Sequence, residues 1–231
     1  MAAFLGALAD LVAPPACAAC GEPLPSARAL CARCEIGLSE CDPAECVACG
    51  LRADRSGVCR RCLDRLAPLA GVRCAFVHDG PIAEAIHAFK YRGRDDLGGR
   101  LGGLLCRALP EPVAPDVLVA PVPLHPRRLR ERGFDQAWLL ARALAGHRHL
   151  RAIPRLLRRV RHGRPQVGLD RQGREANVLG AFEAEPEARG RDVLLVDDVL
   201  TTGATLRAAA RALALAGARQ VTAVTLARAL E

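Results

Sequence analysis

Apolar positions follow two patterns along most of the chain. From about residue 71 onward, continuous apolar runs alternate with segments in which apolar residues recur every three or four positions. The runs predict buried strands, and the second pattern predicts amphipathic helices. Such alternation is typical of a parallel sheet with helices packed on it. We expect strands at 72–80, 116–123, 191–198 and 219–227, and helices at 81–93, 95–109, 134–147 and 203–218.

The segment before this alternation is rich in cysteine instead. Its first residues place apolar side chains such as Phe4, Leu8 and Leu11 at helical spacing, which predicts a short amphipathic helix. Neither Lys nor Arg precedes Cys17, so we do not interpret this helix as an export signal. The chain contains no stretch of 18 apolar residues, and we therefore expect a cytoplasmic protein without membrane insertion.

Eight of the eleven cysteines form four pairs of the form Cys-x-x-Cys. Two intervening residues let both thiolates of a pair turn toward one tetrahedral ion. The first two pairs are ten residues apart and the last two are nine residues apart, which suits two four-cysteine ribbons in series. Four thiolates leave no open position on zinc, so both sites are expected to be structural. The predicted ligands are Cys17, Cys20, Cys31, Cys34, Cys46, Cys49, Cys59 and Cys62.

The cysteines allow two other interpretations. A disulfide framework requires export, and thioredoxin-like chemistry uses one pair and not four. The pairs can combine in sequence order or interleave, and the spacing leaves this open. Cys74 and Cys106 lie in apolar contexts and are predicted core residues, whereas Cys41 is a spare or substitute ligand. We expect loss of zinc to unfold residues 17 to 62 and to spare the rest.

The chain thus divides into two predicted domains, the helix with the double zinc ribbon at 1–66 and the α/β domain at 71–231. The net charge of +8 and the pI near 9.2 favour an anionic partner such as nucleic acid or phosphate. However, Lys90 is the single lysine and alanine is abundant, as GC-rich coding would also produce. A basic, solvated surface without a partner therefore stays equally open.

The string "VLLVDDVLTTGATL" at 193–206 places two acids at the end of a predicted strand. Ligands of parallel sheets bind beyond the carboxyl ends of the strands, where carboxylates can accept hydrogen bonds from sugar hydroxyls or hold magnesium. The following turn leads into a helix whose first N–H groups point toward a bound anion. Together they predict a ribose 5-phosphate site; the alternative is a strand end followed by a threonine cap. The candidates are Asp197 and Asp198 for the ribose or magnesium, and Thr201, Thr202, Gly203, Ala204 and Thr205 for the phosphate.

This string resembles the signature of type I phosphoribosyltransferases. The four Cys-x-x-Cys pairs, "FKYRG", "APVPLHPRRLRERGFDQA", "RPQVGLDRQGREANVLGAF" and the acidic string, in this order, resemble the ComF/GntX family of competence-associated proteins over essentially the whole chain. The resemblance implies an α/β fold, a doubly wound, mainly parallel phosphoribosyltransferase-like sheet behind a small N-terminal zinc-ribbon domain. It also implies that the paired acids bind phosphoribosyl pyrophosphate with magnesium.

The resemblance implies further contacts to pyrophosphate or nucleic acid. The turn at Pro121 and Val122 would receive pyrophosphate, and a loop carries four arginines in six residues. The family usually has Asn where this chain has Asp135, so we transfer no ligand role to it. The six histidines show no ligand spacing and are taken as structural or surface groups. The predicted contact residues are Lys90, Pro121, Val122, Arg127, Arg128, Arg130, Arg132 and Arg174.

Three functions follow as hypotheses. The first is a module that binds phosphoribosyl pyrophosphate and single-stranded DNA during DNA uptake, together with proteins of the competence machinery. The second is an active phosphoribosyltransferase with an unidentified acceptor, and the third is a zinc-ribbon adaptor for protein interactions. Aromatic residues make up 3% of the chain, which argues against extensive stacking of bases. The sequence identifies neither an acceptor nor an oligomeric state.

Overall fold

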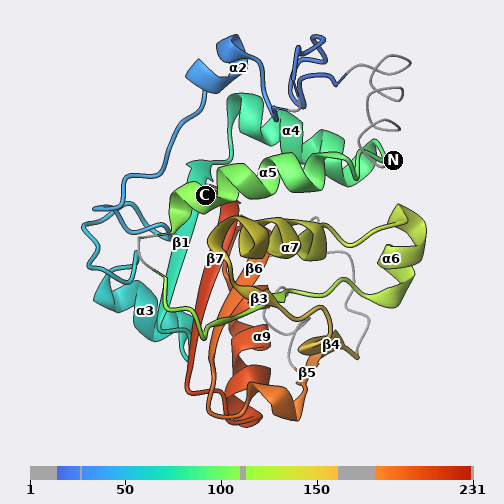
Figure 1. Ribbon diagram of the computed structural model, residues 1–231. Helices are drawn as coiled ribbons and strands as arrows, with labels where there is room; N and C mark the ends of the chain where they lie inside the picture. The colour runs from blue at the N-terminus through green and yellow to red at the C-terminus, as the bar shows by residue number, and fades with distance from the viewer. Residues whose placement is uncertain (1–14, 27, 110–112, 161–179, 230–231) are drawn as a thin grey trace.

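The computed structural model describes residues 15–26, 28–109, 113–160 and 180–229 (Figure 1). The predicted N-terminal amphipathic helix and Arg174 lie outside these ranges. In the part of the chain that is described, no helix combines the length and apolar character needed to cross a bilayer.

A five-stranded sheet in the order β1-β7-β6-β2-β3 forms the centre of the molecule. All of its strand pairs are parallel, as the alternation of runs and helices predicts. β6 lies in the middle because its apolar run, 193–196, is buried on both faces. The strands are β1 (Gly71–Val77), β2 (Leu118–Pro121), β3 (Arg151–Ala152), β6 (Asp192–Leu200) and β7 (Gln220–Arg228).

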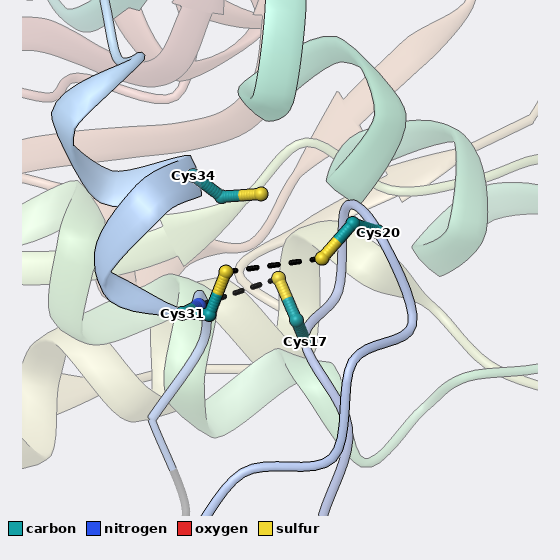
Figure 2. Close-up of side chains that lie close together, drawn as sticks. All are labelled: Cys17, Cys20, Cys31 and Cys34. Atoms are coloured by element: carbon teal, nitrogen blue, oxygen red, sulfur yellow. Dashed lines mark hydrogen bonds between the residues drawn. The ribbon is translucent and has the colours of Figure 1, made fainter.

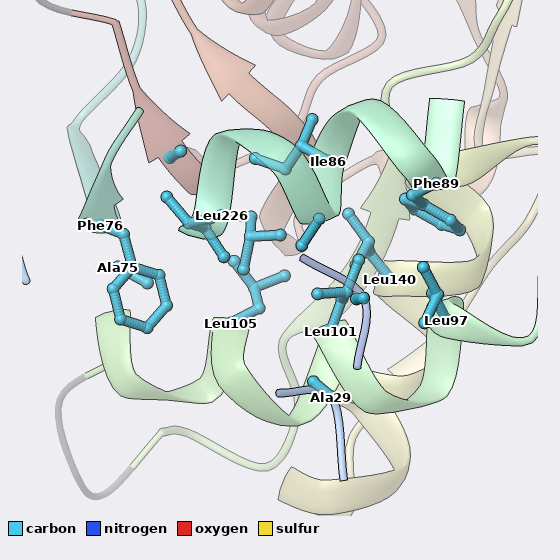
Figure 3. Packing of buried hydrophobic residues seen from close by; sticks show 14 of the residues in the cluster. Ala29, Ala75, Phe76, Ile86, Phe89, Leu97, Leu101, Leu105, Leu140 and Leu226 are labelled. Atoms are coloured by element: carbon cyan, nitrogen blue, oxygen red, sulfur yellow. The ribbon is translucent and has the colours of Figure 1, made fainter. Parts of the chain in front are cut away.

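Helices cover both faces of this sheet (Figure 1). On one face, Leu194 and Val196 share a hydrophobic cluster with residues of three helices, and on the other Val193 and Leu195 share a cluster with α9. Figure 3 shows the first cluster, in which Ile86, Leu101 and Leu140 come from three different helices. The four predicted helices are confirmed as α4 (Gly80–Tyr91), α5 (Leu97–Leu105), α7 (Gln136–Arg148) and α9 (Ala204–Leu215).

Two glycines of α5 explain why a glycine-rich segment is helical. A Cβ atom at Gly98 or Gly102 would collide with Leu139 or Ala143 of α7. The glycines therefore let the two helices approach closely, and the burial gained there offsets their poor helix propensity.

Several short elements were not predicted. The arginine-rich segment interpreted as a loop is instead the helix α6 (Pro126–Arg132), which begins with a proline and ends at Gly133 with φ 85°. β4 (Leu157–Arg159) and β5 (Phe182–Ala184) form an antiparallel pair beside α9. The remaining elements are α2 (Ala32–Ile36), α3 (Arg60–Leu66) and the 3₁₀ turns η1 (Cys106–Ala108) and η2 (Pro186–Ala188).

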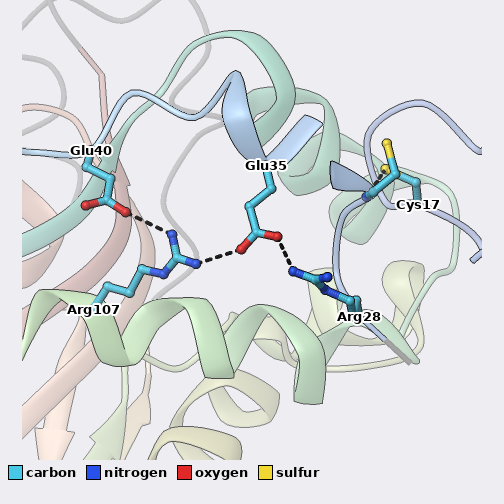
Figure 4. A network of polar contacts seen from close by, with 6 residues as sticks. Cys17, Arg28, Glu35, Glu40 and Arg107 are labelled. Atoms are coloured by element: carbon cyan, nitrogen blue, oxygen red, sulfur yellow. Dashed lines mark hydrogen bonds and ion pairs between the residues drawn. The ribbon is translucent and has the colours of Figure 1, made fainter. Parts of the chain in front are cut away.

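The cysteine-rich segment packs closely on the sheet domain. Glu35 of α2 pairs with Arg28 and accepts a hydrogen bond of 2.9 Å from Arg107, which also donates to Glu40 at 2.8 Å (Figure 4). Residues 17, 18 and 30 belong to the same cluster as α4 and α5, and residues 46, 47 and 66 belong to the cluster of α9. Because both halves of the segment share a core with the sheet domain, we no longer expect loss of zinc to spare the remainder of the chain.

Candidate functional site

Two groups of four cysteine sulfur atoms lie in this segment, and each group combines neighbouring pairs. Figure 2 shows the first group, Cys17, Cys20, Cys31 and Cys34. Within a group all four sulfur atoms lie within 4.8 Å of one another. Cys20 and Cys31 sulfur atoms are 3.8 Å apart, and those of Cys49 and Cys59 are 3.7 Å apart. Tetrahedral zinc with Zn–S bonds of about 2.3 Å places its thiolates about 3.8 Å apart, so both groups fit the ion. The eight predicted ligands are brought together, and the pairing follows sequence order.

The two groups are built by the same local structure. The first pair of each group lies in a turn closed by a glycine with positive φ, Gly21 at 76° and Gly50 at 73°. The second pair begins a short helix, with Cys31 before α2 and Cys59 before α3. Cys41 lies outside both groups, and burial raises the pKa of its thiol.

The remaining two cysteines were predicted to be core residues. Cys74 is buried and its sulfur lies 2.9 Å from Thr225 Oγ1. Cys106 is half-buried against the first hydrophobic cluster, and its thiol donates to the Gly102 carbonyl at 3.4 Å. The prediction is confirmed for Cys74, whereas Cys106 lies at the edge of the core.

A cavity of about 660 Å³ opens at the carboxyl ends of β1, β2, β6 and β7. This is the edge of the sheet at which parallel α/β folds bind ligands. Nine of the predicted contact residues line it, namely Lys90, Val122, Arg128, Arg132, Asp197, Asp198, Thr201, Gly203 and Thr205. Pro121, Arg127, Arg130, Thr202 and Ala204 do not.

The two acids lie within β6 and not after it. The strand continues to Leu200, and Asp197 is in register with Thr225 of β7. Because successive side chains of a strand point to opposite faces, one acid faces α4 and the other faces α9. On the α4 side, Lys90 Nζ lies 2.7 Å from Asp198 Oδ1. The predicted strand, 191–198, ended with the acids, and β6 extends two residues further because its backbone pairing to β7 continues to Leu200.

Asp197 is held in an environment that opposes its ionisation. Burial and the neighbouring Asp198 carboxylate raise the pKa of Asp197 to about 8, although Lys90 and the Asp198 N–H, which donates to Asp197 Oδ1 at 2.9 Å, act against the shift. A magnesium ion or a row of sugar hydroxyls would stabilise the ionised form. The carboxylate pair supplies the oxygen ligands that magnesium prefers.

The turn after β6 is shaped for close approach of an anion. Gly203 has φ 75° and directly precedes α9. Because Gly203 and Thr205 line the cavity, α9 begins at the cavity, where the N–H groups of a helix start can bind an anion. Thr202 Oγ1 accepts from the Ala204 N–H at 3.4 Å. Thr202 thus supports the turn, while Thr201, Gly203 and Thr205 face the cavity.

Helix α6 divides the four arginines into two pairs. Arg128 and Arg132, four residues apart, line the cavity on one face of the helix. Arg127 is exposed and pairs with Glu131 at 3.0 Å, and Arg130 is exposed as well. The sequence alone did not separate them because the helix was not predicted.

Asp135 supports the same region of the fold without entering the cavity. Its carboxylate accepts from the Trp138 N–H at 3.1 Å, which caps α7, and from the Leu124 N–H at 3.3 Å. Leu124 belongs to the turn after β2, so one acid holds the helix and the turn together. Asp135 thus has a structural role, and it does not line the cavity.

Besides His125, which precedes α6, five polar residues of the cavity were not predicted as site residues. His78, Glu84, His87 and Tyr91 line the side formed by β1 and α4, and Arg159 of β4 lines the opposite side. The guanidinium of Arg159 lies 5.5 Å from the ring centre of Phe182, and its Nε is buried without a hydrogen-bond partner among the described residues. Burial also lowers the pKa of Arg159.

Two families match this chain. The double zinc ribbon domain matches residues 8–63, and the phosphoribosyl transferase domain matches residues 142–231. These matches and the geometry confirm the predicted fold class, a largely parallel α/β sheet of the type I phosphoribosyltransferase kind behind two four-cysteine zinc sites.

Several named proteins are similar to this chain over most of their length. DNA utilization protein YhgH of Escherichia coli (strain K12) is 32% identical over 219 residues, which cover 91% of this chain and 96% of that protein. Competence protein F of Haemophilus influenzae is 32% identical over 64% of this chain and 69% of its own length. Competence protein ComFC of Bacillus subtilis is 28% identical over 86% of this chain and 84% of its own length.

Proposed function

This chain belongs to the family of competence protein F and DNA utilization protein YhgH, and from that premise we propose that its cavity binds phosphoribosyl pyrophosphate together with magnesium. We further propose that the protein contacts single-stranded DNA during DNA uptake or use. The double zinc ribbon serves as a structural module whose ions hold the cysteine-rich segment in place.

The proposal rests on one observation, that two acids and an anion-binding turn lie in the same cavity. Asp197 and Asp198 lie at the central strand, and Thr201, Gly203 and Thr205 follow within the same cavity. Acids suit the hydroxyl groups of a ribose and the turn suits its phosphate, so the ligand that matches both is a ribose 5-phosphate. Arg128 and Arg159 add positive charge for a second anionic group such as pyrophosphate.

Contact with DNA is supported by the exposed basic residues. The chain carries a net charge of +8, and Arg127 and Arg130 project away from the cavity on α6. Such residues can neutralise phosphates of a strand that passes over the mouth of the cavity. The names of the relatives mention DNA utilization and competence, which agrees with this partner.

Catalysed transfer is the second candidate, favoured by the volume of about 660 Å³, which exceeds the needs of a lone phosphate. A nucleophile would attack C1 of the ribose while the bond from C1 to the pyrophosphate oxygen breaks, and the electron pair would leave with pyrophosphate. Arg128 and Arg159 would stabilise the leaving charge, the acids would hold the ribose hydroxyls, and the acceptor would lose its proton to water. Magnesium bound with the ligand would neutralise further charge on pyrophosphate.

Calorimetric titration tests the binding proposal. The variant Asp197→Asn/Asp198→Asn should bind phosphoribosyl pyrophosphate with magnesium at least about tenfold more weakly than the wild type. Asp192→Asn is a matched control, because Asp192 lies at the other end of β6 and pairs with Arg219 at 2.7 Å. Unchanged affinity in the double variant would refute the site. Pyrophosphate release, measured with a panel of bases, amines and short single strands, decides whether transfer occurs.

A further inference from the structure

One face of α4 forms a wall of the cavity that the binding of ribose and phosphate leaves unused. Glu84, His87 and Tyr91 are spaced three and four residues apart and therefore lie on one side of the helix. All three are exposed and line the cavity, next to the Lys90–Asp198 ion pair. The wall thus lies beside the acids proposed to hold the sugar.

Planar side chains lie close together at the end of this wall. Tyr91, the single tyrosine of the chain, is 63% exposed, although it is a large aromatic side chain. The guanidinium of Arg132 lies 5.3 Å from the centre of its ring, and the ring of His87 lies 5.0 Å away at an angle of 46°. Unstacked bases stack on the planar side chains of tyrosine, histidine and arginine.

The charge of this wall differs from that of the opposite side. Arg128 and Arg159 face the cavity from α6 and β4 and suit anions. The α4 wall instead offers the carboxylate of Glu84 and the imidazole of His87, which can accept or exchange hydrogen bonds with the N–H groups of a heterocycle. A phosphate would meet repulsion from Glu84, whereas a neutral ring with N–H donors would not.

We infer that Glu84, His87 and Tyr91, with Arg132, form a subsite for a nucleobase beside the sugar-phosphate site. The ring stacks on the planar side chains, and its N–H edge faces Glu84 and His87. This inference rests on the proposed function, because the wall is useful only if a sugar phosphate occupies the acids next to it. The base comes either from a free nucleobase or from an unstacked position of a single strand.

The test uses three ligands and measures the affinity of each for the full-length protein. The first is a strand of twelve deoxythymidines, the second an abasic strand of the same length and charge, and the third free adenine. Tyr91→Leu removes the flat ring, and Tyr91→Phe keeps it. Leu215→Ala is a control at an exposed side chain, 82% accessible, that does not line the cavity.

Stacking on one aromatic side chain changes affinity by about five- to a hundredfold. We expect Tyr91→Leu to lower the affinity for the thymidine strand, or for adenine, by about tenfold. The affinity for the abasic strand should not change. Loss for the strand alone assigns the base to DNA, and loss for adenine alone assigns it to a free base. Equal affinities of Tyr91→Leu and wild type for every ligand would overturn the subsite, as would equal losses in Tyr91→Leu and Tyr91→Phe.

Binding of phosphoribosyl pyrophosphate is measured on the same samples. If Tyr91→Leu binds it normally but loses the base, the inference stands together with the proposed function. If the wild type does not bind phosphoribosyl pyrophosphate at all, the proposed function is wrong. The comparison of thymidine and abasic strands then still tests whether bases stack on this wall.

Discussion

Lys90 Nζ lies 2.7 Å from Asp198 Oδ1, and this ion pair joins α4 to the central strand in the lining of the cavity. The two side chains are only 20% and 14% exposed. Lys90 therefore supplies the positive charge that allows two adjacent acids to lie on one strand without a bound ligand. Lys90 directly precedes Tyr91, the last residue of α4.

The first prediction concerns this pair. Lys90→Met should lower the free energy of unfolding by about 2 kcal/mol, or roughly 4 to 8 °C in Tm, because Asp198 is left partly buried without a partner. Lys90→Met/Asp198→Asn should recover much of the loss, since the uncompensated charge is then removed as well. Thermal melts at pH 8 measure both effects. Equal Tm values for Lys90→Met and wild type would show that the pair is not needed for stability.

The second prediction follows from the raised pKa of Asp197. The folded protein holds a proton on this carboxyl up to about pH 8, whereas the unfolded chain releases it near pH 4. Stability from this group is therefore present at low pH and falls as the pH rises from about 4 to 8. Asp197→Asn should remove this loss of stability. Its Tm should exceed that of wild type by roughly 2 to 4 °C at pH 8.5 and differ little from it at pH 4. A constant difference between the two melting curves across this range would contradict the assignment.

The third prediction separates the arginines of α6. Arg128→Ala should lower the affinity for phosphoribosyl pyrophosphate by about tenfold, because it removes a charge-assisted contact inside the cavity. Arg130→Ala should leave that affinity unchanged and should lower the salt dependence of single-strand binding by roughly 0.7 in log–log slope. The two variants carry the same change of charge on one helix, so each is the control of the other. Equal effects on both ligands would show that general charge, and not position, decides binding.

The fourth prediction concerns Arg159, whose Nε is buried without a hydrogen-bond partner among the described residues. A buried guanidinium N–H without an acceptor destabilises the protein unless a ligand accepts its hydrogen bond. Arg159→Met should therefore raise Tm and lower the affinity for phosphoribosyl pyrophosphate. Arg158→Met is the matched control, because that side chain is 59% exposed and pairs with Glu185 at 2.9 Å. A fall in both Tm and affinity in Arg159→Met would point to a packing role instead.

The sequence predicted those parts of the site that lie in one continuous string. Asp197, Asp198 and the turn at Thr201 are neighbours along the chain, and a buried run directly before them marks the edge of a sheet. The zinc ligands were equally visible, because their spacing reflects the ion directly. In both cases local geometry is enough to specify the chemistry.

The parts that were missed depend on contacts between distant elements. Glu84, His87 and Tyr91 show helical spacing in the sequence, but only the packing of α4 beside β6 turns their face into a cavity wall. Arg159 lies on a strand of three residues, too short for a periodic signal. Helix α6 was missed although Pro126 and Gly133 mark its ends, because four arginines without an apolar stripe favour a loop.

The last prediction links the second zinc site to the phosphate turn. Leu66, at the end of α3, is 5% exposed and packs against Gly203, where an added Cβ would collide with it. Arg207 of α9 also donates to the Arg65 carbonyl at 3.0 Å. The same short helix contains Cys62 and begins after Cys59, so zinc fixes its position. Removal of zinc should therefore release Leu66 and lower the affinity for phosphoribosyl pyrophosphate.

A chelator selective for zinc over magnesium makes this measurable by titration of the zinc-loaded and zinc-free protein. Leu66→Ala should reproduce part of the loss, about tenfold or less, in the presence of zinc. Leu30→Ala is the control, because Leu30 is a similarly buried leucine of the first ribbon, 3% exposed, that does not contact the turn. Both substitutions should cost about 2 to 5 kcal/mol of stability, so stability alone cannot separate them. If zinc-free protein binds as tightly as zinc-loaded protein, the second ribbon does not support the turn, and its ion stabilises the cysteine-rich segment alone.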